Sequence, residues 1–388
     1  MKKRLGSVYL FSKERDFGNL TVSNERRLPG GPDFHTTAYG MKYFHTVFLL
    51  WAVLLAGCSQ NPSGSGDESA PGSSGPLRVG LVFDIGGRGD RAFNDLAYSG
   101  LEDAKKELGV DFIYVEPGGE GGEREAALRQ MADDPEIGMI IGVGLLFSED
   151  ITALAREYPG KKFACVDYMP EEGAPVPSNL SGMTFEEKKG SFLAGALAGL
   201  MTQTNTVGFI GGMDSGIIRK FETGFREGVH FVNPRAALIS GFIGMTGSAF
   251  ANPAKGRELA LGQYGRGADI IYQAAGASGL GVIEAARETG HHVICTDCDS
   301  ESLKDSRILG SMTKAVDRSV FSTVASVADG SFEGGRAVVY GLEDRYTDLV
   351  YSPSNKDRIP SSVLERIEAV RKKILSGEIA LDETAALR

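Results

Sequence analysis

Downstream of residue 77, the chain alternates short apolar runs rich in Val and Ile with stretches whose apolar residues recur at helical spacing. The apolar runs predict strands at residues 77–83, 112–115, 139–143, 163–166, 207–210, 238–242, 270–273 and 292–295. The intervening stretches predict helices at residues 96–108, 124–132, 149–158, 189–201, 221–231, 253–264, 279–289 and 361–375. Because the strands are apolar along their length and are separated by helices, we expect parallel sheets covered on both faces.

These elements fall into two series, residues 77–166 and residues 189–295, each long enough to form a doubly wound lobe. Two such lobes place a cleft at the carboxyl ends of both sheets, where open α/β folds bind their ligands. The pattern therefore predicts an α/β protein with two parallel-sheet lobes and a cleft between them. The final helix, residues 361–375, carries apolar residues at helical spacing, so we expect it to pack on the second lobe.

An apolar run at residues 47–57 stands directly before Cys58, and a tract rich in Ser and Gly follows it. The run is shorter than the ~20 residues that a transmembrane helix needs, and it fits the central part of an export signal. Leu55-Ala56-Gly57-Cys58 resembles the bacterial lipobox, at which the signal is cut before a cysteine that receives lipid. An ordinary secretory signal with a chance cysteine is the alternative. The sequence thus predicts a lipid anchor at Cys58 and a position outside the cytoplasm.

The first forty residues do not fit an export signal, because acidic residues are scattered through a long polar preface. Met41-Lys42-Tyr43 directly precedes the apolar run and supplies a normal basic start. We therefore expect residues 1–40 to be a misassigned start and residues 41–57 to be the signal peptide. Residues 58–76, rich in Ser, Gly and Pro, are expected to be a flexible linker.

The chain has a formal net charge of −10, and removal of residues 1–57, which hold eight Lys or Arg and four Asp or Glu, brings it to −14. So acidic a surface repels polyanions, and nucleic acid is therefore not an expected partner. Besides Cys58, the chain holds Cys165, Cys295 and Cys298, an odd number that argues against a disulfide framework. Cys295 and Cys298 have CxxC spacing, but no second pair or suitably spaced histidines accompany them, so we expect no metal site.

A glycine-rich segment follows the first predicted strand, and one interpretation of it is a dinucleotide site. Gly87, Gly89 and Ala92 match the pattern G-x-G-x-x-[GA], and Glu116 stands where a ribose-binding acid belongs. Against this, Asp90 would place a carboxylate inside the turn that should hold pyrophosphate. Nicotinamide cofactors are also scarce outside the cytoplasm. An NAD-dependent oxidoreductase is therefore the less favoured alternative, and we expect no cofactor.

The same segment suits a neutral ligand better. Phe93 can stack on a flat ring, and Asn94 and Asp90 can each bind polar edges. The competing interpretation is that Phe93 is a core residue and Asp90 the N-cap of the next helix. No nucleophile, base and acid pattern of a hydrolase appears elsewhere in the sequence.

Five segments along the chain form a more specific pattern. They are Asp90-Arg91-Ala92-Phe93-Asn94, Phe185-Glu186-Glu187 with Gly190-Ser191-Phe192-Leu193-Ala194-Gly195, Gly211-Gly212-Met213 with Phe221-Glu222-Thr223-Gly224-Phe225-Arg226-Glu227-Gly228-Val229, Phe250-Ala251-Asn252-Pro253-Ala254-Lys255-Gly256, and Asp297-Cys298-Asp299. In this order they resemble the basic membrane protein family, which includes purine-nucleoside receptor lipoproteins. The resemblance covers about residues 77–375.

The resemblance implies a type I periplasmic-binding-protein fold with a hinge. Residues 77–187 and about 314–330 would form lobe 1, and residues 188–313 and about 331–388 would form lobe 2. The protein would be a monomeric receptor, held at the membrane by its lipid anchor, that delivers a purine nucleoside to the permease subunits of an ABC importer. It would not be an enzyme. A sugar or autoinducer receptor of the same fold is the alternative.

The resemblance also assigns roles by position. Phe93 and Phe221 would sandwich the base, one from each lobe. Asp297 would accept hydrogen bonds from ribose hydroxyls, and Lys314 would reach the same sugar. The candidates for the base edge or the polar wall of the cleft are Asn94, Asp90 and Asp167. From the residues alone, Asp297 could equally cap a turn, and Lys314 could be a solvated charge.

The chain departs from the family pattern at two places. Arg91-Ala92 replaces the usual Lys-Ser, at a position that we expect on the rim of the cleft. Cys298-Asp299-Ser300 lacks the glutamine often found after D-x-D, which could alter the contacts with the sugar. Because ligand contacts would come from both lobes, binding is expected to favour a closed state.

Overall fold

Strands and helices alternate through the part of the chain that the computed structural model describes, which is residues 75–118, 122–351 and 353–383. The strands are β1 (Arg78–Val82), β2 (Asp111–Val115), β3 (Met139–Val143), β4 (Lys162–Val166), β5 (Leu180–Phe185), β6 (Thr206–Met213), β7 (Ala237–Gly244), β8 (Ile270–Ala274), β9 (His292–Thr296), β10 (Ile308–Lys314), β11 (Arg336–Tyr340) and β12 (Thr347–Val350).

The α-helices are α1 (Phe93–Leu108), α2 (Gly122–Asp133), α3 (Ser148–Glu157), α4 (Glu187–Met201), α5 (Gly216–Val232), α6 (Pro253–Gly265), α7 (Gly279–Thr289), α8 (Val316–Ala328), α9 (Pro353–Lys356) and α10 (Ser361–Leu375). Short 3-10 helices are η1 (Leu145–Phe147), η2 (Gly247–Ala251), η3 (Gly276–Ser278) and η4 (Ser302–Lys304). No helix within the described ranges combines the length and the apolar character needed to span a bilayer. Cys58, the predicted signal and the predicted linker up to residue 74 lie outside the described residues.

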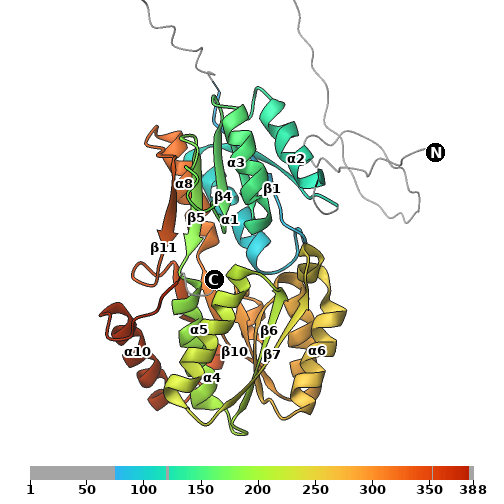
Figure 1. Cartoon of the computed structure of the whole chain (residues 1–388), viewed down its shortest axis with the longest axis vertical. Coiled ribbons are helices and arrows are strands. Elements are labelled where there is room, and N and C mark those ends of the chain that lie inside the picture. The colour runs from blue at the N-terminus through green and yellow to red at the C-terminus, as the bar shows by residue number, and fades with distance from the viewer. Residues whose placement is uncertain (1–74, 119–121, 352, 384–388) are drawn as a thin grey trace, which may run out of the picture. The chain divides into compact units, whose positions relative to one another are not determined.

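The strands form two six-stranded sheets, one in each lobe (Figure 1). The order is β11-β5-β4-β3-β1-β2 in lobe 1 and β12-β10-β9-β8-β6-β7 in lobe 2. Neighbouring strands are parallel except β10 and β12, which are antiparallel. The two sheets confirm the predicted α/β fold class with two parallel-sheet lobes.

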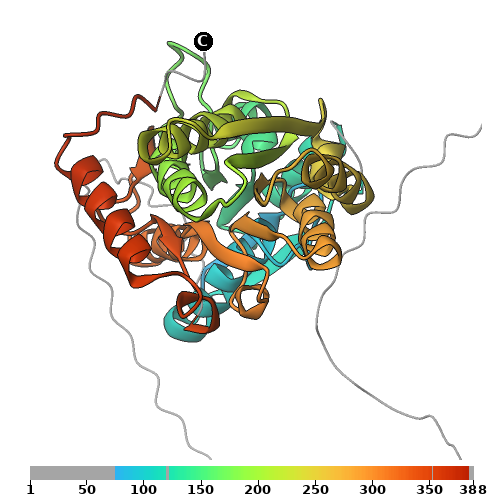
Figure 2. The same ribbon diagram turned by 90° about the horizontal axis from the view of Figure 1, so that it is seen from below.

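Helices cover both faces of each sheet, which explains why the central strands are apolar throughout. In lobe 1, α1 and α8 pack on one face, and α2 and α3 pack on the other. In lobe 2, α4, α5 and α10 share one apolar core, and α6 and α7 form another. The view from below shows α10, in red, beside the rest of lobe 2, as its predicted packing requires (Figure 2).

The chain passes between the two sheets three times, from β5 to α4, from β10 to α8 and from β11 to β12. Hydrogen bonds join these crossovers. The N–H of Glu186 donates to the carbonyl oxygen of Tyr340 at 3.1 Å, and the N–H of Leu342 donates to Glu186 Oε2 at 3.1 Å. The N–H of Ala315 donates to the carbonyl oxygen of Tyr346 at 2.6 Å. The three crossovers therefore lie together, as the strands of a hinge do.

Each predicted strand and helix is present, with bounds that differ by five residues at most. The sequence did not indicate β5, β10, α8, β11 or β12. β5 and β10 interrupt their apolar residues with Ser, Gly and Thr, so they lack the continuous apolar run of the other strands. The predicted placement of residues 331–388 in lobe 2 is wrong for β11, because β11 pairs with β5 in the sheet of lobe 1.

Helices α4 and α5 approach so closely that their backbones touch. A Cβ atom on Gly195 would lie 2.1 Å from the carbonyl oxygen of Phe225, and one on Gly228 would lie 2.0 Å from that of Phe192. Real Cβ atoms do not come within 3.0 Å of such atoms, so only glycine fits at either position. This packing also fixes the position of Phe221, which α5 carries into the cleft.

We expect Gly228→Ala to lower the free energy of unfolding by about 1–3 kcal/mol, because the added methyl group forces the two helices apart. Gly262→Ala is the matched control. Gly262 is exposed within α6 and nothing lies within 4 Å of its Cβ position, so alanine there should raise the free energy of unfolding by about 0.5–1 kcal/mol. Urea denaturation of the three proteins measures both effects. Equal stability of Gly228→Ala and the wild type would contradict the packing argument.

Candidate functional site

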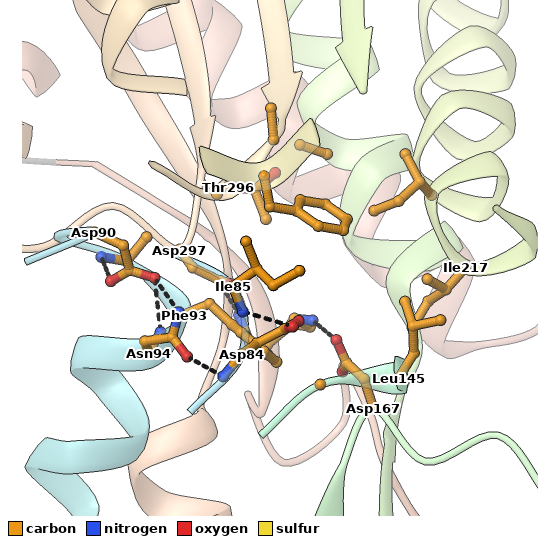
Figure 3. A pocket seen from close by; sticks show the side chains of 18 of the residues that line it. Asp84, Ile85, Asp90, Phe93, Asn94, Leu145, Asp167, Ile217, Thr296 and Asp297 are labelled. Carbon is orange, nitrogen blue, oxygen red and sulfur yellow. Dashed lines mark hydrogen bonds and ion pairs between the residues drawn. The ribbon is translucent and has the colours of Figure 1, made fainter. Parts of the chain in front are cut away.

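A cavity lies where the carboxyl ends of the strands of both sheets meet (Figure 3). Lobe 1 lines it with residues that follow β1, β3 and β4 and with the start of α1. Lobe 2 lines it with the first turns of α5, with η2 and with the ends of β8, β9 and β10. The lining residues enclose about 620 Å³ of space free of protein atoms, part of it open to solvent.

All seven ligand-binding candidates from the sequence line this one cavity. They are Asp90, Phe93, Asn94, Asp167, Phe221, Asp297 and Lys314. The cavity also contains residues that the sequence analysis did not assign to ligand binding, among them Asp84, Phe250 and Thr296. Asp84 lies two residues after the end of β1, so its position at the carboxyl end of a parallel strand was the available signal.

The carboxylate of Asp90 lies at the amino end of α1. Its Oδ1 accepts hydrogen bonds from the N–H groups of Ala92 at 2.9 Å and Asp95 at 3.2 Å, and its Oδ2 accepts from the N–H of Asn94 at 2.8 Å. The N-cap position itself is held by Ala92, so the N-cap interpretation of Asp90 is wrong in position, but the Asp90 carboxylate does accept hydrogen bonds from N–H groups at the start of the helix. This carboxylate also takes up the N–H groups that a bound pyrophosphate would need, which argues against a dinucleotide site at the glycine-rich segment.

The side chain of Asn94 connects Asp90 to Asp84. Its Nδ2 donates to Asp90 Oδ2 at 3.1 Å, and its Oδ1 accepts from the N–H of Asp84 at 3.1 Å (Figure 3). Asn94 is buried, as are both aspartates. The contacts made by Asn94 therefore hold the loop after β1 against α1, and in this way they position Phe93.

Lys314 lines the cavity and is 3 % exposed. Its Nζ donates to Asp167 Oδ2 at 2.6 Å, so an ion pair joins the end of β10 to the end of β4. Burial lowers the pKa of Lys314, but the charges of Asp167, Asp297 and Glu187 outweigh it and hold the pKa above its ordinary value. Lys314 is thus a buried cation, not the solvated charge of the competing interpretation.

Two aromatic rings, one from each lobe, face the same small volume. The Nζ atom of Lys314 lies 4.5 Å from the ring centroid of Phe93 and 5.6 Å from that of Phe221. Phe221 is buried, whereas Phe93 is half-buried and also packs against the core of lobe 1. Phe93 therefore lines the cavity and also contacts the core, and its stacking on a ligand ring stays a prediction.

Buried carboxyl groups supply most of the polar lining. Burial raises the pKa of Asp84 to about 7 and that of Asp297 to about 7, and in each case hydrogen bonds and nearby cations only partly offset it. Asp297 Oδ1 accepts from the N–H of Lys314 at 2.6 Å. Asp167 Oδ1 is buried, and no group among the described residues donates a hydrogen bond to it. A buried acceptor without a donor costs roughly 1–3 kcal/mol, which a ligand's hydroxyl or amino group can relieve.

The backbone is left-handed at both Asp167 and Asp297, with φ of 57° in each case. Non-glycine residues adopt this region at some cost, and aspartate is among those that tolerate it best. Each aspartate ends a central strand, and the unusual turn aims its carboxyl group into the cavity. The local strain is thus concentrated where the lobes face each other.

The cavity as a whole holds four carboxyl groups, from Asp84, Asp90, Asp167 and Asp297, but Lys314 is the only lysine or arginine among its lining residues. Such a site offers acceptors to hydroxyl and amino groups and repels phosphate. The expectation that the CxxC segment holds no metal stays a prediction. Cys295 and Cys298 pack in one apolar cluster, and no group of metal-ligating side chains occurs in residues 75–118, 122–351 and 353–383.

Comparison with known proteins gives consistent matches over the described part of the chain. Residues 77–385 match the Bmp family, described as ABC transporter substrate-binding protein PnrA-like. The chain is 32% identical to Basic membrane protein A of Borreliella afzelii, over 79% of this chain and 91% of that protein. It is 29% identical to the ABC transporter nucleoside-binding protein BmpA of Lactococcus lactis subsp. cremoris, over 86% of this chain and 96% of that protein. A crystal structure of ABC transporter solute-binding proteins from Aeropyrum pernix K1 matches with a TM-score of 0.71 and 25% identity, over 79% of this chain and 94% of that chain.

We expect Asp84→Asn to stabilise the ligand-free protein more at pH 8 than at pH 5. The raised pKa of Asp84 means that the folded state keeps its proton while the unfolded state loses it, so stability falls as pH rises from about 4 to 7. Asparagine removes this loss, which is on the order of 2–3 kcal/mol between pH 5 and 8. Urea denaturation at both pH values measures it, with Asp103→Asn on the exposed side of α1 as a control for net charge. If Asp84→Asn changed the free energy of unfolding by the same amount at pH 5 and at pH 8, the expectation would be contradicted.

Proposed function

Because the chain belongs to the Bmp family of ABC transporter substrate-binding proteins, we propose that its cavity captures a purine nucleoside and presents it to an ABC importer. Proteins of this family bind a substrate for a transporter and are not enzymes. The relative from Lactococcus lactis is named a nucleoside-binding protein, which supports nucleosides as the ligand class. The importer, a monomeric state and the identity of the nucleoside are parts of the proposal.

The observation that carries the proposal is the pair of rings of Phe93 and Phe221, which face one volume from opposite lobes. A flat purine between them gains stacking on both faces, worth roughly 1–3 kcal/mol per base and ring. Only the closing of the lobes brings both rings onto one base. The stacking energy therefore favours the closed state over the open state.

The carboxyl groups that line the cavity can bind the polar groups of the sugar and of the base edge. Asp297 and Lys314 lie together at the ends of β9 and β10, where they can bind a ribose diol as acceptor and donor. The Oδ1 atom of Asp167 and the carboxyl group of Asp84 remain for the polar edge of the base. We assign Asp90 and Asn94 a positioning role, because their polar atoms are already bonded within lobe 1.

The predicted export signal and lipid anchor complete the proposal. A lipid on Cys58 would keep the protein outside the cytoplasm at the membrane surface, and residues 59–76 would link it to the described lobes. The protein would thereby stay within reach of its importer.

Isothermal titration calorimetry tests the ligand class. We expect adenosine, guanosine or inosine to bind, and monosaccharides and NAD not to bind. A nucleoside 5′-monophosphate should bind at least about 10-fold more weakly than its nucleoside, because the cavity carries an excess of carboxylates. Binding of a monosaccharide without any nucleoside would instead support a sugar receptor of the same fold.

Removal of either ring tests the sandwich. We expect Phe93→Ala and Phe221→Ala each to weaken nucleoside binding by about 5- to 100-fold, the loss that corresponds to the stacking of one base face. Phe231→Ala is the matched control, since Phe231 is carried by the same helix as Phe221 but is exposed and does not line the cavity. Unchanged affinity in both cavity variants would show that the base does not lie between the rings.

Substitution of the predicted anchor tests the location. We expect Cys58→Ser to lose both incorporation of labelled fatty acid and retention in the membrane fraction, because serine lacks the thiol that receives the lipid. Cys298→Ser removes a cysteine from the described part of the chain and should keep both. Labelling that persists in Cys58→Ser would rule out this site of attachment.

A further inference from the structure

Two residues outside the ligand cavity connect the lobes directly. Arg91, in the loop before α1, contacts Asp299, which follows β9. The Nε atom of Arg91 donates to Asp299 Oδ2 at 3.1 Å, and Nη2 donates to Oδ1 at 3.3 Å. The N–H of Asp299 also donates to the carbonyl oxygen of Arg91 at 3.0 Å. Three hydrogen bonds thus connect lobe 1 to lobe 2 at this point.

The contact lies within the two segments that carry the cavity residues. Phe93 follows Arg91 by two positions, and Asp297 precedes Asp299 by two. Neither segment belongs to the crossovers between the sheets, which are joined by their own hydrogen bonds. The Arg91–Asp299 contact therefore holds together parts of the lobes that the hinge does not connect.

We propose that Arg91 and Asp299 form a clasp that holds the two lobes closed over a bound ligand and slows its release. The slower release of a ligand rests on the proposed function. The effect of the pair on the closing of the lobes rests on the contacts alone. Arg91 and Asp299 do not line the cavity, so the clasp acts through the distance between the lobes and not through contact with the ligand.

Each half of the clasp is held by its own lobe. The N–H of Arg91 donates to Asp95 Oδ2 at 3.0 Å, and the backbone of Arg91 is left-handed with φ of 54°. On the other side, Asp299 Oδ1 accepts from the N–H of Ser302 at 2.6 Å. Burial opposes ionisation of Asp299, but the hydrogen bonds from Arg91 and Ser302 outweigh it and lower its pKa. Each group is therefore oriented by contacts within its own lobe, and Asp299 is ionised where the lobes are in contact.

The chemistry of the pair sets the size of the effect. The guanidinium group presents two N–H groups to the two carboxylate oxygens, a geometry that a lysine ammonium cannot reproduce. The side chains are 42% and 36% exposed, however, and exposed ion pairs are weak and sensitive to salt. We therefore expect a change in release rate of about 2- to 5-fold, and not the loss of binding.

Stopped-flow measurement of nucleoside association and dissociation tests the clasp. We expect Arg91→Gln and Asp299→Asn each to raise the dissociation rate by about 2- to 5-fold and to change the association rate by less than about 2-fold. The double variant with Arg91→Asp and Asp299→Arg, which exchanges the two charges, should restore slow release. Either of these two substitutions alone should not. Raising the salt concentration should speed release from the wild type but have little effect on Arg91→Gln.

Arg88→Gln is the matched control, because Arg88 lies in the same loop but pairs with Asp95 within lobe 1 at 2.7 Å. It removes the same charge and should leave the dissociation rate unchanged. Dissociation rates that are unchanged in Arg91→Gln and Asp299→Asn would overturn the clasp, and so would an equal increase in Arg88→Gln.

Small-angle scattering of the ligand-free protein separates this inference from the proposed function. We expect Arg91→Gln to have a larger radius of gyration than the wild type and Arg88→Gln to match the wild type. If no nucleoside binds to the wild type, the proposed function fails, and the clasp is judged by this measurement. Equal radii of gyration for Arg91→Gln and the wild type would then overturn it.

Discussion

The buried ion pair between Lys314 and Asp167 is the interaction on which the site depends. It joins the end of β10 in lobe 2 to the end of β4 in lobe 1 at 2.6 Å, and both side chains are almost completely buried. Removing one partner of such a pair leaves an uncompensated buried charge, at a cost of roughly 3–5 kcal/mol. The negative charges that act on this ammonium group come from Asp167, Asp297 and Glu187, and they keep the lysine charged in spite of its burial. One cation thus sets both the electrostatic balance of the site and the approach of the lobes.

The fold supplies this arrangement by placing polar groups at the ends of strands that are otherwise apolar. The sheets need continuous apolar strands to bury both faces, so no acid can stand within them without a partner. Left-handed turns at Asp167 and Asp297 move the first polar residue after each strand into the space between the lobes. Tight packing of α4 on α5 holds Phe221 against this space from the other side. The cavity is therefore polar at the strand ends and aromatic at the helices.

Much of this could be predicted from the sequence, and the limits have physical reasons. Apolar runs located the central strands because they are buried on both faces, but β11 has exposed positions and was assigned to the wrong lobe. The family resemblance brought together all seven candidates for the cavity. It could not show that Asp90 and Asn94 use their polar atoms within lobe 1, since hydrogen-bond partners depend on the geometry of the loop. The sequence also could not show that Asp84 lines the cavity or that Arg91 pairs with Asp299, because both depend on contacts between segments that lie far apart in the chain or in different elements.

The proposed function requires a purine to lie between Phe93 and Phe221 with its polar groups on the buried carboxylates. A crystal structure of the protein grown with a bound nucleoside tests this most directly. We predict that the base stacks between the two rings and that a ligand N–H or O–H donates to Asp167 Oδ1, the buried acceptor that no described residue satisfies. A nucleoside bound outside the rings, or one that leaves Asp167 Oδ1 without a donor, would contradict the claim.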